Sequence, residues 1–373
     1  MKEIAFIDLA AQQTRLIDNV RIATDKVFAH GQYILGPEVK ALEQELAKFS
    51  NIPHVIACSN GTDALKLALM ALGLEKGDVV ICPSFTFVAT SEAPALLGIE
   101  SYFVDVDEHT YVITPEIIEA ALKDCWQRKI RPKAVIGVDL FGVPVDYEGI
   151  FKICKQYGVA YINDAAQSYG AVYKGQPAIS YCDIATTSFF PAKPLGCYGD
   201  GGAVFCRDDD MASLIRSLAF HGAGQDKYEN IRIGDNCRLD TLQAAILLEK
   251  LKIFPDEMNL RQDVVNYYTT HLSPHCKTPT VIEGGVSSWA QYTIEVENRD
   301  ILEQKMREKN ITTAVYYPKP NHLQLPYQHM PRADGGLAIT EKIKNHVVSL
   351  PMHPYLQKDI QDYIIQMSID SMK

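Results

Sequence analysis

Short apolar runs alternate with stretches of helical hydrophobic spacing through the first two-thirds of the chain. Leu65, Leu69 and Leu72 illustrate the three-to-four-residue repeat that predicts a helix. The apolar runs predict strands over residues 55–58, 79–82, 102–104, 134–138 and 159–162. The stretches between them predict helices over residues 62–72, 86–97, 115–126 and 147–157. This alternation predicts a mostly parallel sheet covered by helices, in which ligands bind beyond the carboxyl ends of the strands.

The pattern changes in the last third of the chain. A long helix is expected over residues 241–268, broken at Pro255 because proline removes a helical hydrogen bond. After it, β-like runs at residues 291–296 and 313–317 surround a helix near 300–309, and a last helix covers 358–367. We therefore expect a large α/β domain over residues 1–250 and a smaller C-terminal α+β domain over residues 251–373.

Composition narrows the possible functions. The chain has 373 residues, 47% of them hydrophobic, and a formal net charge of -10 at pH 7. An acidic chain of this kind argues against binding to nucleic acid, and an anionic ligand then needs a local positive site. No signal peptide or membrane-spanning run is visible, and nine scattered cysteines without a Cys-x-x-Cys pair fit reduced thiols in the cytoplasm. No metal site is expected.

The most informative motif surrounds Lys193, in the string Ser-Phe-Phe-Pro-Ala-Lys-Pro-Leu-Gly-Cys-Tyr-Gly-Asp-Gly-Gly that begins at Ser188. An isolated lysine is most often a surface residue. Here aromatic bulk, two stiffening prolines and a glycine-rich turn argue for a partly dehydrated amine, whose pKa falls. Such an amine forms a Schiff base with a carbonyl, and pyridoxal phosphate (PLP) uses a lysine of this kind.

Further candidates follow the expected strands. Gly61 and Thr62 open a helix whose free amides suit a phosphate, although an ordinary capped helix has the same pattern. Asp164 ends an apolar strand, where it could keep a pyridine nitrogen protonated or simply cap a helix. Gln167, one helical turn later, could donate to a ring hydroxyl, although a polar loop residue is the commoner role of an isolated glutamine.

Aromatic, hydroxyl and basic residues complete the candidate set. Phe85 follows a strand and could stack on a pyridine ring, although core packing is the commoner role of such a residue. Ser188 could reach the phosphate. Asn236 could also bind phosphate, and Arg238 could bind an anionic group or form a structural ion pair with Asp240.

Together these motifs resemble the DegT/DnrJ/StrS sugar aminotransferase family, which has the aspartate-aminotransferase-like fold of type I PLP enzymes. The resemblance runs through nearly the whole chain and includes Gly36-Pro37-Glu38-Val39, Asp164-Ala165-Ala166-Gln167 and Arg238-Leu239-Asp240. It implies that Lys193 holds PLP covalently and moves the proton, and that Asp164 pairs with the pyridine nitrogen. The other implied cofactor-binding residues are Gly61, Thr62, Asp63, Phe85, Ala166, Gln167, Ser188 and Asn236.

The resemblance also implies the substrates and partners. L-glutamate would be the amino donor, and a nucleotide-linked ketosugar would be the acceptor. The strings at residues 6–9, 30–39, 238–248 and 350–356 favour C3 of UDP-2-acetamido-2-deoxy-3-oxo-glucuronate, for surface polysaccharide or lipopolysaccharide biosynthesis. Asn236 and Arg238 would reach into the site of a neighbouring subunit, which implies a homodimer with shared active sites. Arg238, Tyr316, Tyr317 and His322 are the expected substrate contacts.

The chain departs from the family's motifs at two places, and three alternative functions remain open. Tyr316-Tyr317-Pro318 stands where similar enzymes have His-Tyr-Pro, and Asp235 stands where an apolar residue is usual. A 4-keto-6-deoxy nucleotide sugar or a keto-inositol is an alternative acceptor. A dehydratase of the same family would carry histidine in place of Lys193. A non-catalytic regulatory protein with this fold is the alternative from another class.

Overall fold

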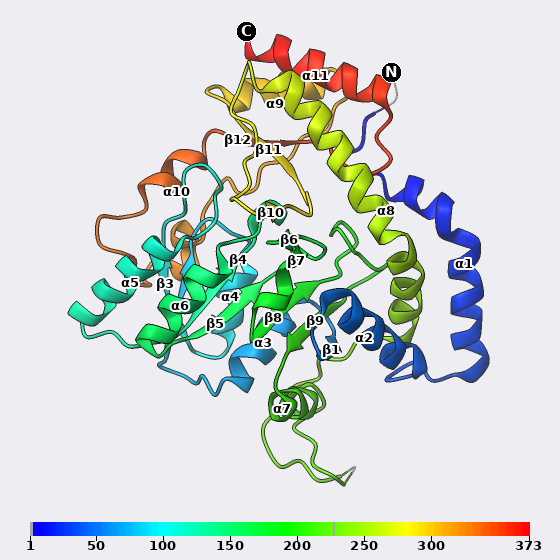
Figure 1. Ribbon diagram of the computed structural model, residues 1–373, viewed down its shortest axis with the longest axis vertical. Helices are drawn as coiled ribbons and strands as arrows, with labels where there is room; N and C mark the ends of the chain where they lie inside the picture. Colours follow the sequence, from blue (N-terminus) through cyan, green and yellow to red (C-terminus); the bar gives the residue numbers. More distant parts are fainter. Residues whose placement is uncertain (1–2, 227) are drawn as a thin grey trace.

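A computed structural model describes residues 3–226 and 228–373. Its centre is a seven-stranded sheet with the order β1-β9-β8-β5-β4-β2-β3 (Figure 1). All pairings except those of β9 are parallel, so the expectation of a mostly parallel sheet is confirmed. The strands are β1 (His54–Cys58), β2 (Val79–Pro83), β3 (Glu100–Val104), β4 (Pro132–Val138), β5 (Ala160–Asp164), β8 (Ile184–Ser188) and β9 (Gly202–Cys206).

Helices cover both faces of this sheet and make a three-layer sandwich. One hydrophobic core lies between the sheet and α2 (Pro37–Ser50), α5 (Pro115–Gln127), α6 (Tyr147–Tyr157) and part of α8 (Thr241–Leu272). The opposite core lies between the sheet and α3 (Gly61–Ala71), α4 (Ala89–Leu96) and α7 (Asp209–Ala219). Successive residues of β4 alternate between the two cores: Val135 faces the first, and Ala134 and Ile136 face the second. Near-continuous apolar strands are therefore required, as the sequence has them.

A third core joins the C-terminal part of the chain to its N-terminal arm. It contains the end of α8 (Thr241–Leu272), the two-stranded sheet of β11 (Tyr292–Glu295) and β12 (Val347–Leu350), α9 (Arg299–Glu308) and α11 (Lys358–Met372). Ile4 of the arm packs into the same core. The expected domain boundary between residues 250 and 251 falls inside α8, and the division into two domains stays a prediction.

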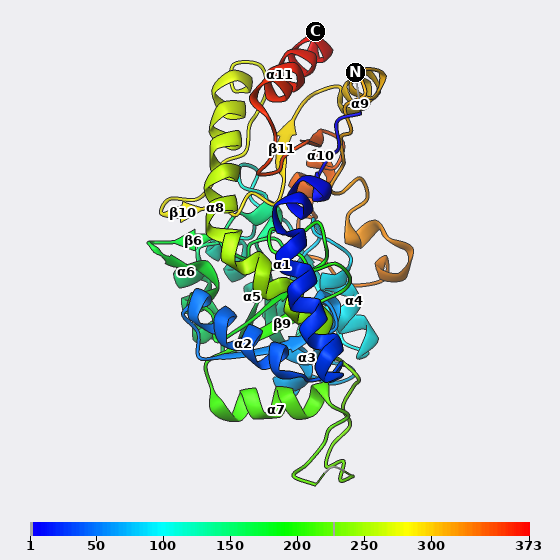
Figure 2. The ribbon, with the colours of Figure 1, turned by 90° about the vertical axis from the view of Figure 1, so that its right-hand side faces the viewer.

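Helix α8 corrects the expectation of a break at Pro255. The helix is continuous from Thr241 to Leu272 with Pro255 inside it. Buried residues on both sides of the proline hold the helix in place, because Phe254 packs in the first core and Glu257 accepts bonds from Gln12 and Tyr355. The lost backbone hydrogen bond is therefore tolerated. Helix α1 (Leu9–His30), capped by Asp8, lies along α8 (Figure 2).

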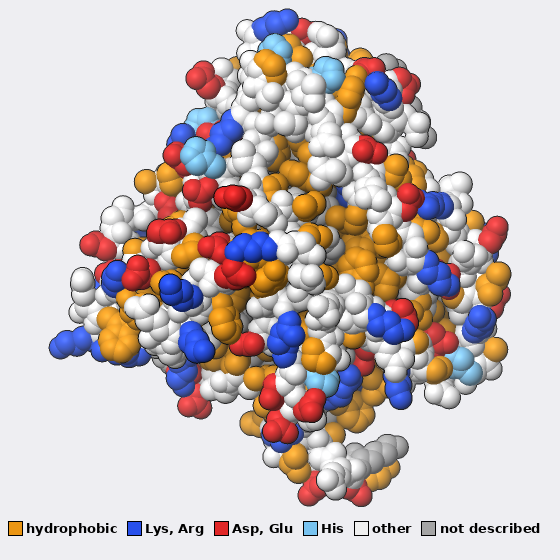
Figure 3. Space-filling model, in the orientation of Figure 1, with side chains coloured by type: hydrophobic (Ala, Val, Ile, Leu, Met, Phe, Trp, Pro, Cys, Tyr) orange, Lys and Arg blue, Asp and Glu red, His pale blue; other side chains and the backbone are white. Residues whose placement is uncertain are grey.

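The remaining elements are short and connect the larger ones. They are β6 (Val172–Tyr173), β7 (Gln176–Pro177), β10 (Gly285–Val286), α10 (Ala338–Ile343) and the 3-10 turns Leu140–Gly142, Ala178–Tyr181, Asn321–Leu323 and Leu325–Tyr327. The expected run at residues 313–317 is not a strand; it makes one bridge, between Ala314 and Ser349. Among the described residues, no helix combines the length and apolarity needed to cross a bilayer. Positive and negative side chains are interspersed on the face drawn in Figure 3.

Candidate active site

A cavity of about 590 Å³ lies beyond the carboxyl ends of β5 and β8, where the parallel sheet predicts a ligand. It brings together residues from the strand ends, the start of α3, the N-terminal arm and the segment before β11. Its lining consists of Ile7, Asn60, Gly61, Thr62, Asp63, Leu65, Thr86, Phe87, Ala89, Glu92, Val138, Asp164, Ala166, Gln167, Ser188, Phe190, Ala192, Lys193, Asp200, Gln291, Tyr316 and Tyr317. Ten of the residues predicted from the sequence are in this set.

Lys193 lies in the loop between β8 and β9, and the loop's own backbone fixes its place. Lys193 N donates to Phe190 O at 2.8 Å, and Cys197 N donates to Phe189 O at 2.7 Å. Gly196 has to be glycine, because a Cβ there would lie 2.5 Å from Pro191 O. Burial lowers the pKa of the Lys193 amine, and the nearby Asp164 carboxylate partly opposes that shift. A lysine that deprotonates readily can act as a nucleophile and as a base.

Asp164 ends β5 and is 6% exposed. Its Oδ1 accepts from Ala166 N at 3.2 Å, and its Oδ2 accepts from Thr90 Oγ1 at 3.1 Å. Burial raises the pKa of this carboxyl, while these two donors and the Lys193 charge lower it. A buried carboxylate held by few donors has capacity for one more, such as the N–H of a protonated pyridine. The hydrogen bonds around the Asp164 carboxylate therefore leave a position that fits the pyridine N–H of PLP.

The Gln167 side-chain amide has a defined orientation. Its Oε1 accepts from Phe141 N at 2.7 Å, and its Nε2 donates to Tyr317 Oη at 3.2 Å. Since the Phe141 amide can only donate, it fixes the oxygen away from the cavity and leaves the NH2 group on the cavity side. Gln167 is therefore placed to donate to a ring hydroxyl. Phe141 itself gave no signal in the sequence.

The start of α3 forms a cradle for a phosphate. Asn60 caps the helix by accepting from Asp63 N at 2.8 Å, and the first amides, at Gly61 and Thr62, have no intrahelical partner. Gly61 lies so close to β8 that a Cβ would meet Ser188 Cβ at 2.8 Å. The helix start, Ser188 and the fit around Gly61 are suited to a phosphate. Asp63 also lines the cavity, but its carboxylate is bound to Lys66 at 2.8 Å.

Two sequence predictions need correction, and the first concerns Phe85. Phe85 is fully buried in the first core, where it contacts Tyr111 and Tyr317, and it does not line the cavity. It keeps the strand alternation of Val79 and Ile81, which face the same core. Phe87, which is 51% exposed, lines the cavity instead and is the aromatic placed to stack on a ring.

The second correction concerns His322. Its ring is 4% exposed, its Nδ1 bonds to Ser84 Oγ at 2.7 Å and its Nε2 bonds to Glu341 at 2.8 Å. Both ring nitrogens are thus engaged in joining the Asn321–Leu323 turn to neighbouring segments, and the residue is structural. Gln291 is a cavity residue that the sequence did not suggest. It is 9% exposed, and its Oε1 has no hydrogen-bond partner in the part of the chain described.

Asn236 and Arg238 lie outside the cavity of their own chain. They belong to the segment between α7 and α8, and Asn236 bridges to Phe220 just after α7. Part of this segment extends beyond α7 in Figures 1 and 2. Arg238 forms no ion pair with Asp240, or with any other acid within residues 3–226 and 228–373. Its guanidinium donates a hydrogen bond to Asn236 Oδ1, and its Cζ lies 5.0 Å from the centre of the Phe220 ring. The alternative of a structural ion pair with Asp240 is therefore wrong.

Comparison with protein families gives a match that covers nearly the whole chain. The DegT/DnrJ/EryC1/StrS aminotransferase family matches residues 16–368. A Pseudomonas aeruginosa protein named UDP-2-acetamido-2-deoxy-3-oxo-D-glucuronate aminotransferase is 47% identical over 354 residues, covering 95% of this chain and 96% of the relative.

Solved structures agree with the sequence matches. A DegT/DnrJ/EryC1/StrS aminotransferase from Brucella abortus has a TM-score of 0.97 and 46% identity, with 99% of both chains covered. The NtdA structure from Bacillus subtilis, which contains the cofactor PMP (pyridoxamine phosphate), has a TM-score of 0.90 and 28% identity, covering 100% of this chain and 86% of that chain. The expected fold class is confirmed.

Phe85 and Phe87 allow a paired test of the site. Phe87→Ala removes a half-exposed ring from the cavity, so we expect cofactor affinity to fall about tenfold with little loss of stability. Phe85→Ala leaves a cavity in the core and should lower the free energy of unfolding by about 3–5 kcal/mol. Cofactor release followed by absorbance and urea unfolding of the apoprotein measure the two effects. A larger loss of cofactor affinity in Phe85→Ala would contradict this assignment.

The Asp139 carboxyl should make the free energy of unfolding depend on pH. The carboxyl is buried beside the Asp164 backbone, and this burial raises its pKa to about 6. Its Oδ2 accepts hydrogen bonds from Ser168, Tyr147 and Asn163. A pKa raised in the folded state means that the protonated form is preferred, so this group's stabilisation is lost as pH rises from about 4 through 6. Relative to Asp139→Asn, the wild type should lose about 3 kcal/mol of unfolding free energy over that range.

Urea unfolding at intervals between pH 4 and 7 measures the difference between the wild type and Asp139→Asn. Asp18→Asn, which changes an exposed acid on α1, serves as the matched control and should follow the wild type. Parallel stability curves for the wild type and Asp139→Asn would show that Asp139 does not titrate in this range.

Proposed function

Because this chain belongs to the DegT/DnrJ/EryC1/StrS aminotransferase family, we propose that it aminates C3 of UDP-2-acetamido-2-deoxy-3-oxo-glucuronate. The observation that carries this choice of acceptor is the 47% identity to the Pseudomonas aeruginosa enzyme over almost the full length of both chains. The expectation of a PLP-dependent sugar aminotransferase is confirmed.

The residues of the cavity fit PLP at each end of the cofactor. Lys193 would hold it covalently, Asp164 would keep the proton on the pyridine nitrogen, and Gln167 would donate to the ring hydroxyl. The amides of Gly61 and Thr62 with Ser188 would bind the phosphate, and Ala166 and Phe87 would cover the two ring faces. When bound, PLP supplies an electron sink that stabilises negative charge at a substrate carbon, and it carries the amino group from donor to acceptor.

Lys193 is the proposed base. Burial lowers the pKa of its amine, which favours the neutral form, and Nζ can then accept the proton from the α-carbon of the donor. The Asp164 carboxylate stabilises the resulting ammonium, since it lowers the free energy of a positive charge nearby. The pair thus allows the same nitrogen to take up and return a proton in the two halves of the reaction.

The charge of the cavity supports a shared site. Lys193 is the one cationic residue in the lining described above, whereas Glu92, Asp63, Asp164 and Asp200 are acidic. A UDP-linked uronate carries several negative charges and requires cations that this lining does not supply. Arg238 has no acidic partner among the described residues and is available to a second copy of the chain. We therefore propose a homodimer in which Asn236 and Arg238 complete the partner's site.

Exposed apolar side chains near the segment that carries Arg238 fit this assembly. Ile231 and Ile233 are 54% and 90% exposed, and Tyr33, Ile34 and Leu35 lie exposed after α1. Ile34 also bridges to Asp240, directly after the Arg238 segment. Several large apolar side chains left exposed close to one segment fit a protein interface.

Substrate contacts within the chain come from the C-terminal part. Tyr316 and Tyr317 line the cavity, as predicted, and Gln291 takes the place proposed for His322. A buried amide oxygen without a partner costs about 1–3 kcal/mol. A sugar hydroxyl or the N–H of a 2-acetamido group would satisfy Gln291 Oε1.

The amino donor, the location and the pathway are proposals as well. L-glutamate is the proposed donor. The cytoplasm is the proposed location, since all nine cysteines are free thiols. The aminated sugar would then be used in surface polysaccharide or lipopolysaccharide synthesis.

An acceptor panel tests the proposed function. With L-glutamate as donor, the 3-oxo-glucuronate should give the highest kcat/KM, above UDP-N-acetyl-3-dehydroglucosamine and 4-keto-6-deoxy dTDP-sugars. Mass spectrometry of the products measures the amination, and Lys193→Ala should show no turnover. A higher kcat/KM for a 4-keto-6-deoxy sugar would overturn the proposed acceptor.

Gln291→Leu separates a binding role from a structural one. Removing a buried amide whose oxygen has no partner should leave the free energy of unfolding unchanged or raise it, while KM for the nucleotide sugar rises about tenfold. Gln304→Leu, a change on the exposed face of α9, is the matched control for both measurements. An unchanged KM in Gln291→Leu would remove the residue from the substrate site.

A further inference from the structure

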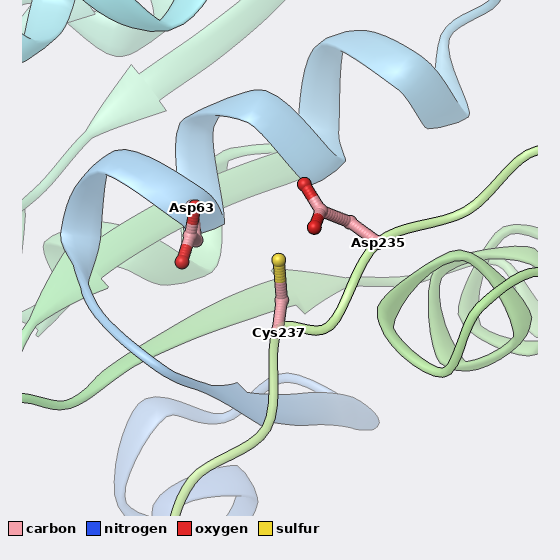
Figure 4. A group of neighbouring side chains, drawn as sticks. All are labelled: Asp63, Asp235 and Cys237. Carbon is pink, nitrogen blue, oxygen red and sulfur yellow. The ribbon is translucent and has the colours of Figure 1, made fainter.

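Asp235, which replaces the apolar residue expected from the resemblance, is bound to the helix of the phosphate cradle. Its Oδ2 forms an ion pair with Lys66 Nζ, and the same Nζ binds Asp63 Oδ1 at 2.8 Å. Lys66 lies one turn into α3, and its side chain is 14% exposed. Figure 4 shows Asp63 on that helix facing Asp235 on the segment before α8. A single ammonium thus joins the two segments.

The surroundings keep this bridge ionised. Although burial alone would lower it, the bonds to Asp235 and Asp63 raise the pKa of Lys66 above its usual value, and Lys66 lowers the pKa of Asp235. Cys237 completes a group that could otherwise hold a metal ion, but burial raises its pKa to about 12 and keeps it a thiol. The Lys66 ammonium occupies the role of the cation between the two carboxylates.

Asp235 also fixes the residues that follow it. Its Oδ1 accepts from Asn236 N at 2.7 Å, and its backbone is bonded on both sides, to Leu218 O at 2.7 Å and from His221 N at 2.9 Å. The Asn236 side chain then accepts a bond from Arg238. The orientation of Asn236 and Arg238 therefore depends on where Asp235 is held.

We propose that Asp235 is a positioning residue: through its ion pair with Lys66, it holds Asn236 and Arg238 in the geometry that the active site of the partner subunit requires. This inference rests on the proposed dimer with shared sites. Because Asp63 lines the cavity of its own chain, Lys66 connects each cofactor cradle to the segment that the same chain lends to its partner.

Asp235→Asn tests the positioning role. The variant keeps the shape but loses the charge, so we expect KM for the nucleotide sugar to rise about tenfold while kcat stays within about twofold. Asp235→Glu keeps the charge and should restore most of the loss. Thermal unfolding should be similar in all three proteins. An unchanged KM in Asp235→Asn would overturn the proposal.

A hybrid dimer tests whether the effect crosses the interface. Asp235→Asn and Lys193→Ala chains carrying different tags are co-expressed, and the mixed dimer is purified through both tags. Its one working site has Lys193 from the Asp235→Asn chain and the intact Asn236–Arg238 segment from the other chain. If Asp235 acts on the partner's site, kcat/KM per dimer should be about half of the wild-type value.

If Asp235 acts within its own chain, the same hybrid should reach only about one-twentieth of the wild-type kcat/KM, because its working site still carries the defect. A second hybrid of Lys193→Ala with Arg238→Ala controls for the shared site itself. Recovery in the Arg238 hybrid without recovery in the Asp235 hybrid overturns the positioning role alone. Failure of the Arg238 hybrid to recover overturns the shared site and, with it, this inference.

Discussion

The active site depends on two neighbouring titratable groups, the buried Asp164 and the partly buried Lys193, beyond the ends of two parallel strands. Asp164 ends β5, Lys193 follows β8, and β5 and β8 are neighbours in the sheet. Parallel pairing places the carboxyl ends of both strands at one edge of the sheet. Asp164 and Lys193, which are about thirty positions apart in the sequence, therefore lie at the same cavity. Burial disfavours the charge on each group, and proximity favours it. The balance keeps both protonation states of the lysine accessible, which a base that must also return its proton requires.

The sequence predicted the parts of the site that depend on backbone geometry. A lysine between prolines, a helix that opens with Gly-Thr and a carboxylate at a strand end each carry a local signal, because each needs a particular turn or cap. Lys193, Asp164, Gln167 and Ser188 accordingly lie around one cavity. The sheet was predicted for the same reason, since the alternation of strand and helix is written locally in hydrophobic spacing.

Side-chain direction was the part that sequence reasoning missed. Phe85 and Phe87 are two residues apart, and only the register of the preceding strand distinguishes the ring in the core from the ring in the cavity. His322 has the chemistry of a substrate contact, but Ser84 and Glu341, far from it in the sequence, engage both ring nitrogens. The helix across Pro255 likewise depends on tertiary packing that outweighs a local breaker. In each case the deciding partner is distant along the chain.

The unequal distribution of charge gives the second constraint on this enzyme. The charged residues of the cavity lining are acidic apart from Lys193, yet the proposed sugar nucleotide is an anion. In the proposed homodimer, an arginine from the partner chain resolves that conflict only if it is held in place, because a mobile side chain loses conformational entropy on binding. The proposed restraint is the ion pair of Asp235 with Lys66. Lys66 is also paired with Asp63 at the phosphate cradle. The same ammonium group therefore contacts both the proposed cofactor-binding helix and the segment proposed to bind substrate.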